Sequence, residues 1–93
     1  MIRSFADKRT AAIFLERPAR GVSDALARTV KRKLDLMHAA GRVEDLATPP
    51  CNRLEKLKGD RAGQWSIRVN DQWRICFAWD GTDAVDVEFV DYH

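Results

Sequence analysis

The strongest constraint on the fold lies in residues 64–79, where apolar and polar side chains alternate in two successive runs. Such alternation is typical of strands that bury one face. The apolar positions of the two runs are Trp65, Ile67, Val69, Trp73, Ile75, Phe77 and Trp79. Between the runs, Asn70-Asp71 suits the tip of a hairpin. The stretch therefore predicts two antiparallel strands with a dense apolar face and a second face that carries Arg68 and Arg74.

The remaining elements follow from local signals on either side of this hairpin. Short strands are expected at 2–5 and next to Leu54 and Leu57, and helices at 7–16 and from the N-cap Ser23 to Gly41. In the last strand, Val85, Val87 and Phe89 alternate with acidic residues and are expected to share the apolar face. The order β-α-α-β-β-β-β predicts an α+β fold in which two N-terminal helices pack on one face of a mostly antiparallel, twisted sheet.

Length and composition limit the class of protein. A chain of 93 residues with 45% hydrophobic residues predicts a single domain spanning residues 1–93. No run approaches the roughly 18 apolar residues of a membrane span, and the first residues lack a signal-peptide core, so we expect a cytoplasmic protein. Cys51 and Cys76 form no metal-ligand pattern, so we expect free thiols, no metal and no cofactor.

Charge is distributed unevenly along the chain. The formal net charge is +2, yet residues 80–93 hold five acidic residues and no Lys or Arg, so the rest of the chain is basic. A basic face of this kind can accept phosphates. An ordinary mixed surface has the same composition, so charge by itself does not decide for a nucleic-acid partner.

The polar sheet face has the side chains needed to cleave RNA without a metal. Attack of a 2′-hydroxyl on the adjacent phosphorus needs a base, an acid for the 5′-oxygen and cations for the phosphoryl oxygens. The candidates are Glu55, Lys58, Arg68, Arg74, Tyr92 and His93. Each has a plain alternative: the two arginines can pair with Asp71 or Glu88, and Glu55 with Lys56 or Lys58. Strict alternation also places His93 on the core side and Tyr92 on the open side, unless a bulge or fraying turns His93 outward.

The order of these motifs resembles a known family. Residues 57–69 (LKGDRAGQWSIRV), then Trp73-Arg74-Ile75 and the final Asp91-Tyr92-His93 resemble the HigB toxins of the RelE superfamily, closest to the GraT/HigB plasmid-maintenance killer type. The resemblance implies a RelE-like fold and a toxin of a type II toxin–antitoxin system that cleaves mRNA in the ribosomal A site. It implies as partners a HigA/GraA-type helix-turn-helix antitoxin, the ribosome and mRNA, with operator DNA reached only through the antitoxin and no membrane.

The same resemblance assigns roles to individual residues. Arg74 matches the phosphate-stabilising arginine and Tyr92-His93 the functional C-terminal pair, while Lys58 and Arg68 match basic positions that contact RNA, with Arg61 as a further RNA-binding candidate. HigB relatives often have His where this chain has Glu55, whereas YoeB-type toxins have Glu there. Glu55 is therefore expected to be base or orienter, His93 the general acid and Arg74 the transition-state cation, although which of Glu55 and His93 is the base stays open. The alternative function is a non-catalytic module that blocks translation through its basic sheet face.

Deletion of His93 separates the two functions. Loss of a general acid lowers the rate roughly 10²–10⁴-fold, so the chain without His93 should melt normally, bind antitoxin and no longer arrest growth. The measurements are thermal melting, antitoxin pull-down and growth after induction. A truncated chain that folds and still arrests growth at wild-type expression would exclude a catalytic role for His93 and leave Glu55, Arg74 and Tyr92 to carry the chemistry.

Overall fold

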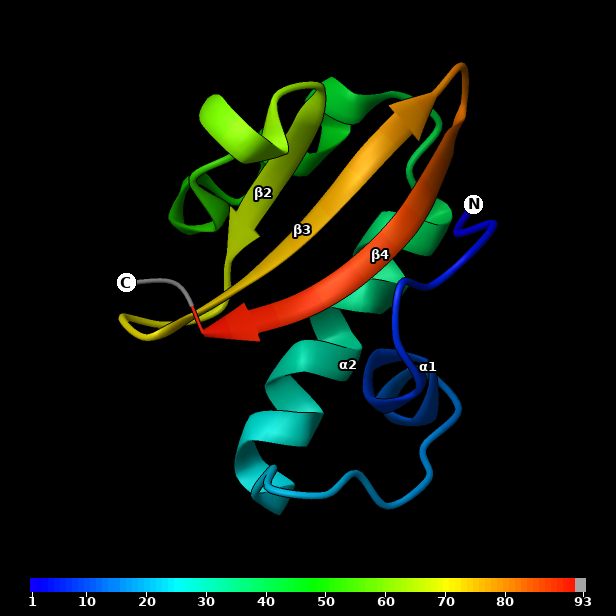
Figure 1. Ribbon diagram of the computed structural model, residues 1–93, viewed down its shortest axis with the longest axis vertical. Helices are drawn as coiled ribbons and strands as arrows, with labels where there is room; N and C mark the ends of the chain where they lie inside the picture. Colours follow the sequence, from blue (N-terminus) through cyan, green and yellow to red (C-terminus); the bar gives the residue numbers. More distant parts are fainter. Residues whose placement is uncertain (92–93) are drawn as a thin grey trace.

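The protein folds as two helices packed on one side of a four-stranded antiparallel sheet, which confirms the predicted α+β class (Figure 1). The computed structural model describes residues 1–91. The helices are α1 (Lys8–Phe14) and α2 (Asp24–Ala39), and the strands, in sheet order, are β1 (Glu55–Lys56), β2 (Gln64–Arg68), β3 (Trp73–Asp80) and β4 (Asp83–Asp91). The described part of the chain also contains three 3₁₀ segments: η1 (Val43–Ala47), η2 (Pro50–Asn52) and η3 (Gly59–Arg61).

Both helices begin at side-chain caps. The Asp7 carboxylate accepts a hydrogen bond from the Thr10 amide at 2.9 Å, and the Ser23 hydroxyl accepts one from the Leu26 amide at 3.2 Å. The predicted N-cap of α2 is thus confirmed, whereas α1 starts at its own cap and is shorter than the predicted 7–16. Within residues 1–91, neither helix is long and apolar enough to cross a membrane.

The apolar face of the sheet packs against α2, as the alternating pattern predicted. Val30, Leu34 and Met37, one stripe of α2, have no exposed surface. They form one core with the strand residues Ile67, Ile75, Phe77, Val87 and Phe89. The three tryptophans are half-buried at its margin, and Trp73 stacks on Phe89 with ring centroids 4.3 Å apart. These aromatic rings belong to the core side of the sheet and leave the other face to polar side chains.

The predicted first strand at 2–5 does not form a regular strand. Residues 2 and 5 make isolated parallel bridges to Ala84 and Val87, so this segment runs along the outer edge of β4. Main-chain hydrogen bonds flank each bridge: Arg3 N–H to Ala84 C=O at 2.8 Å and Ala84 N–H to Met1 C=O at 2.9 Å, then Val87 N–H to Ser4 C=O at 3.1 Å and Ala6 N–H to Val87 C=O at 2.9 Å. A continuous ladder is interrupted because β4 itself is irregular between these two contacts.

That irregularity is a β-bulge at Asp86, and it corrects the prediction for Val85. Ala78 pairs with Val85, but Cys76 pairs with Glu88, so β4 has one residue more than β3 between these pairs. Asp86 has a positive φ of 54° and its amide donates to the Ser4 hydroxyl at 2.9 Å. Val85 therefore shares the face of Ala78, not the apolar face of Val87, and is half-buried.

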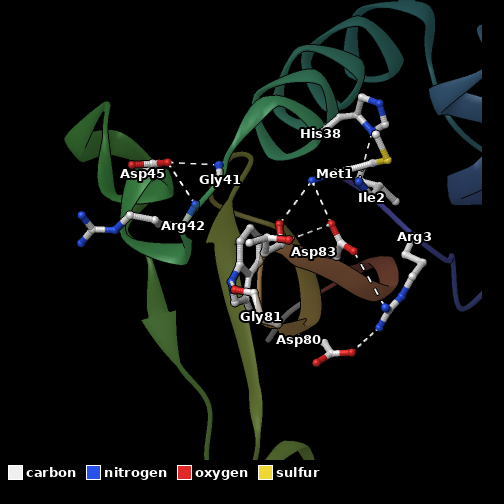
Figure 2. A network of polar contacts seen from close by, with 12 residues as sticks. Met1, Ile2, Arg3, His38, Gly41, Arg42, Asp45, Asp80, Gly81 and Asp83 are labelled. Atoms are coloured by element: carbon white, nitrogen blue, oxygen red, sulfur yellow. Dashed lines mark hydrogen bonds and ion pairs between the residues drawn. The ribbon is translucent and has the colours of Figure 1, made fainter.

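Side chains hold the N-terminal segment against the sheet and α2 (Figure 2). The Ile2 amide donates to Nδ1 of His38 at 3.1 Å, and the Arg3 guanidinium bonds the Asp80 carboxylate. Arg3 also lies 3.8 Å from Asp83. The Asp80 hydrogen bond and charge raise the pKa of Arg3, yet exposed pairs of this kind stabilise by little. Their main effect is to define where the segment crosses the edge of β4.

Thr10 bonds the main chain of β4 at this edge, and replacing it should destabilise the fold. Its buried hydroxyl accepts the Phe89 amide at 3.0 Å. Thr10→Val leaves that amide without its acceptor, so we expect the free energy of unfolding to fall by roughly 1–3 kcal/mol, measured by chemical denaturation. The matched control is Thr29→Val, since the Thr29 hydroxyl bonds only within α2: it donates to the Ala25 carbonyl and accepts from the exposed Arg32 guanidinium at 3.5 Å. Equal stability of the two variants would contradict a structural role for the Thr10–Phe89 contact.

Candidate functional site

The register of the sheet brings the predicted polar residues into rows on the face opposite the helices. Ser66 pairs with Glu55 on one side and with Cys76 on the other, and Cys76 pairs with Glu88. Directly paired residues project to the same face of a sheet. The row Glu55–Ser66–Cys76–Glu88 therefore crosses all four strands, and Arg68 lies opposite Arg74 in the next row.

Arg74 is the best-anchored cation of this face. Its Nε–H donates to the Ser66 hydroxyl at 2.8 Å and its Nη2 donates to the Arg53 carbonyl at 2.9 Å. The same Nη2 lies 3.6 Å from Oε2 of Glu55, and the arginine side chain is only 12% exposed. A guanidinium is planar, so contacts at two of its nitrogens fix the orientation of the whole group. Glu55, 58% exposed, keeps its carboxylate at the surface beside it.

A second arginine covers the centre of the row. Arg61, from η3, donates to Gln64 Oε1 at 2.9 Å and to Glu88 Oε1 at 3.0 Å. Beneath this cover Cys76 has no exposed surface, and Ser66 has none either. Burial raises the pKa of the Cys76 thiol, with Glu88 adding to the rise, while Arg61 and Arg74 oppose it. The thiol is therefore held neutral, and it contributes packing rather than a nucleophile.

Arg68 is held by the hairpin that follows its strand. Its guanidinium pairs with the Asp71 carboxylate, which is 99% exposed. The predicted alternative for this arginine is thus confirmed, whereas Glu88 pairs with Arg61 instead of with either predicted arginine. Like charges directly opposite one another destabilise a sheet. The Arg68–Arg74 pair is therefore an arrangement that a bound anion would relieve.

The predicted site residues fall into three groups. Glu55, Arg61, Arg68 and Arg74 come together on the open face. Lys58 is exposed at the start of η3, the turn that also carries Arg61. Tyr92 and His93 lie outside the described residues, so their predicted roles stay predictions; β4 is described as far as Asp91.

Three contributors to the site escaped prediction from the sequence, and a fourth, Glu88, was expected to pair with Arg68 or Arg74 but pairs with Arg61. Ser66, Gln64 and Glu88 fix the two arginines through side chains, and Arg53 does so through its main-chain carbonyl. The alternation of residues 64–69 predicts that Gln64 and Ser66 share the face of Arg68, and the register agrees. No sequence signal marks the Arg53 carbonyl, because its contact depends on how the segment before β1 is folded.

Comparison with known proteins assigns the chain to a family. A family model described as the RelE-like toxin of the type II toxin–antitoxin system HigB matches residues 3–93. The chain belongs to the HigB-like toxins. The family resemblance drawn from the motifs is thereby confirmed.

Two relatives are similar to the HigB-like chain in sequence, and one solved structure is similar to it in fold. It is 33% identical over 93 residues to the endoribonuclease HigB of Proteus vulgaris, with all of both chains covered. It is 42% identical over 58 residues to toxin HigB-1 of Vibrio cholerae, covering 62% of this chain and 61% of that protein. The YoeB–YefM complex of Staphylococcus aureus contains a chain that is similar in fold, with a TM-score of 0.58, 14% identity, and coverage of 100% of this chain and 98% of that one.

The donor set of the HigB-like site consists of carboxylates and cations that pair with one another. Within residues 1–91, no three His, Cys, Asp or Glu side chains are grouped closely enough to hold a metal ion. Both cysteines are free thiols, as predicted: Cys51 is exposed and Cys76 is buried.

Proposed function

We propose that this HigB-like toxin is a metal-independent endoribonuclease that cleaves mRNA in the A site of the ribosome and so stops translation. The proposal follows the full-length similarity to a protein named endoribonuclease HigB. The observation that carries it is the geometry at Arg74, whose anchored guanidinium lies 3.6 Å from the Glu55 carboxylate on a face that also carries Arg61 and Arg68. A cation and a base side by side are what attack on a phosphodiester requires.

The reaction assigns one task to each group. The 2′-oxygen attacks phosphorus and gives its proton to the base, the P–O5′ bond breaks, and the 5′-oxygen takes a proton from the acid. Glu55 is the proposed base or orienter, His93 the proposed acid, and Tyr92 orients the ring or meets the substrate. Arg74 stabilises the charge that builds on the phosphoryl oxygens, because its contacts fix it before the substrate arrives.

The basic residues around this pair would hold the RNA backbone. Arg68 faces Arg74 across the β2–β3 pairing, and Lys58 and Arg61 belong to the η3 turn beside them. These groups recognise phosphate and carry no base-reading contacts of their own. The ribosome would then supply the in-line alignment of the nucleotide, an effect worth several kcal/mol of a barrier. This action places the protein in the cytoplasm with the ribosome and mRNA as its targets.

Replacing Arg74 tests the function directly. We expect Arg74→Ala to lower the rate of ribosome-bound mRNA cleavage by roughly 10²–10³-fold, the loss typical of one preorganised charge-stabilising group. Arg74→Lys should recover little, because an ammonium cannot reach both the Ser66 hydroxyl and the Arg53 carbonyl in a fixed plane. The measurements are transcript mapping after induction and single-turnover cleavage on purified ribosomes.

The matched control is Arg42→Ala, since Arg42 is 74% exposed and pairs with Glu44 away from the sheet face. This variant should cleave as the unmodified protein does. Cleavage products should carry a 2′,3′-cyclic phosphate and a 5′-hydroxyl. Products with a 5′-phosphate would exclude attack by the 2′-hydroxyl, and arrest of translation without cut mRNA would favour the non-catalytic blocking module instead.

The antitoxin, we propose, is a HigA/GraA-type helix-turn-helix protein that contacts the helical side of the toxin and carries the complex to operator DNA. The outer edge of β4 is occupied by residues 1–6 and by α1 side chains, so it is closed to strand addition along most of its length. A groove between the α1–α2 loop and α2 is lined by apolar Ile13 and Val22 and by exposed Arg17, Arg28 and Arg32. Glu16, Asp24 and Asp35 line the groove as well, so the complementary partner is an acidic helix or segment that meets the three arginines.

Charge reversal on α2 tests the antitoxin surface. We expect Arg28→Glu with Arg32→Glu to weaken antitoxin binding at least tenfold while leaving mRNA cleavage unchanged, since both lie on the helical side. Lys31 is a poorer choice because its ammonium packs 4.5 Å from the Phe14 ring and pairs with Asp35. Titration calorimetry measures the affinity, with Arg42→Glu as the control. Unchanged affinity in the double variant would place the antitoxin on another surface.

A further inference from the structure

Asn52 is a fully buried polar residue at the junction of three segments. Its amide nitrogen donates to the Leu46 carbonyl at 3.1 Å and to the Thr48 carbonyl at 3.3 Å. Its amide oxygen accepts a hydrogen bond from the Lys33 ammonium of α2. The side chain therefore uses both its amide donor and its amide acceptor, and it has no exposed surface. Satisfied buried networks of this kind hold one geometry.

The backbone after Asn52 takes a shape that leads directly into the site. Asn52 N–H donates to the Pro49 carbonyl at 2.9 Å, and Arg53 N–H donates to Pro50 at 3.1 Å, which closes the η2 turn. Arg53 then adopts a left-handed conformation with φ 47° and ψ 55°. A non-glycine residue in this region costs free energy and needs its surroundings to hold it. Only Leu54 separates it from Glu55 at the start of β1.

The segment 53–55 supplies two of the contacts that define Arg74. The Arg53 carbonyl accepts from Arg74 Nη2 at 2.9 Å, and the Glu55 carboxylate lies 3.6 Å from the same nitrogen. Both depend on the direction in which the chain leaves Asn52. Asn52 itself is buried on the side of Leu46 and Lys33, so it does not meet the substrate.

We propose that Asn52, held by Lys33, is a positioning residue for Arg74 and Glu55. It fixes the left-handed turn at Arg53, and that turn aims one carbonyl and one carboxylate at the same guanidinium nitrogen. This role rests on the proposed function for its catalytic consequence, but the orientation of Arg74 is measurable without any cleavage. Lys33 links the site in the same way to α2, the central helix of the core.

Asn52→Asp tests the role with the smallest change of shape. The variant keeps an oxygen for Lys33 but replaces the donor to Leu46 and Thr48 by a second oxygen, which repels both carbonyls. Displacing a reacting group by about 1 Å can cost 10²-fold, so we expect single-turnover cleavage on saturating ribosomes to fall at least tenfold. Half-saturation by ribosomes should stay near the wild-type value, because the exposed basic residues are untouched.

The control must lose stability without altering the turn. Val30→Ala opens a cavity in the core on α2, far along the chain from residues 52–55, and should cleave at the wild-type rate at a temperature where both variants are folded. If Asn52→Asp does not fold, Lys33→Met takes its place, since methionine keeps the packed stem and removes only the ammonium. A cleavage loss that the Val30→Ala control shares equally would overturn the positioning role.

Nuclear magnetic resonance of the Arg74 side chain gives the second measurement. In the wild type the Nε–H donates to Ser66 at 2.8 Å and should exchange slowly with solvent. In Asn52→Asp we expect at least tenfold faster exchange and a shifted Nε resonance, while Val30→Ala should leave both unchanged. An unshifted Arg74 resonance in a folded Asn52→Asp or Lys33→Met protein would overturn the inference.

The outcomes keep the two proposals apart. If Arg74→Ala cleaves at the wild-type rate, the proposed function fails whatever Asn52 does to the resonance. If Arg74→Ala is inactive but Asn52→Asp cleaves as Val30→Ala does, the function stands and the positioning role is overturned. Loss of cleavage together with release of the Arg74 Nε–H supports both.

Discussion

The site depends first on the antiparallel pairing of β2 with β3. This pairing sets Ser66 opposite Cys76 and Arg68 opposite Arg74, so the Ser66 hydroxyl lies within reach of the Arg74 Nε–H. A slip of one residue would send every side chain to the other face. The apolar residues of both strands prevent it, because Ile67, Ile75 and Phe77 are fully buried beneath α2. Core packing thus determines the register, and the register places the candidate catalytic cation.

The outer strand is stabilised by a different arrangement. β4 lies at one side of the sheet, where unpaired main-chain groups would invite association with another chain. The N-terminal residues pair with its first half, and the Ser4 hydroxyl accepts from the bulged Asp86 amide. Further along, the Thr10 hydroxyl accepts from the Phe89 amide and the Arg9 guanidinium donates to the Phe89 carbonyl. Arg9 also lies 5.0 Å from the Phe89 ring, a cation–π contact. These contacts hold β4 over most of its length.

The charged residues of the open face form ion pairs that stabilise the fold, and they also set two arginines directly opposite each other. Arg61 pairs with Glu88 and Arg68 with Asp71, yet these ion pairs are partly exposed and each stabilises the fold by at most about 1 kcal/mol. Arg74 differs because two hydrogen bonds and the Glu55 ion pair hold it in a mostly buried setting, directly opposite a second arginine. A phosphodiester would relieve that opposition, which links the sheet register to the proposed chemistry of the HigB-like toxin.

The sequence by itself determined the fold class, the family and the face on which Glu55, Arg68 and Arg74 lie, because strand alternation and ordered motifs are local properties of the chain. It failed at the first strand and at Val85, where one bulge in β4 changed the phase and broke the expected ladder. Only the tertiary structure decided that Glu88 pairs with Arg61, and that the Arg53 carbonyl reaches Arg74. Such contacts join segments more than 20 residues apart, and they depend on how packed elements meet in space rather than on any short pattern.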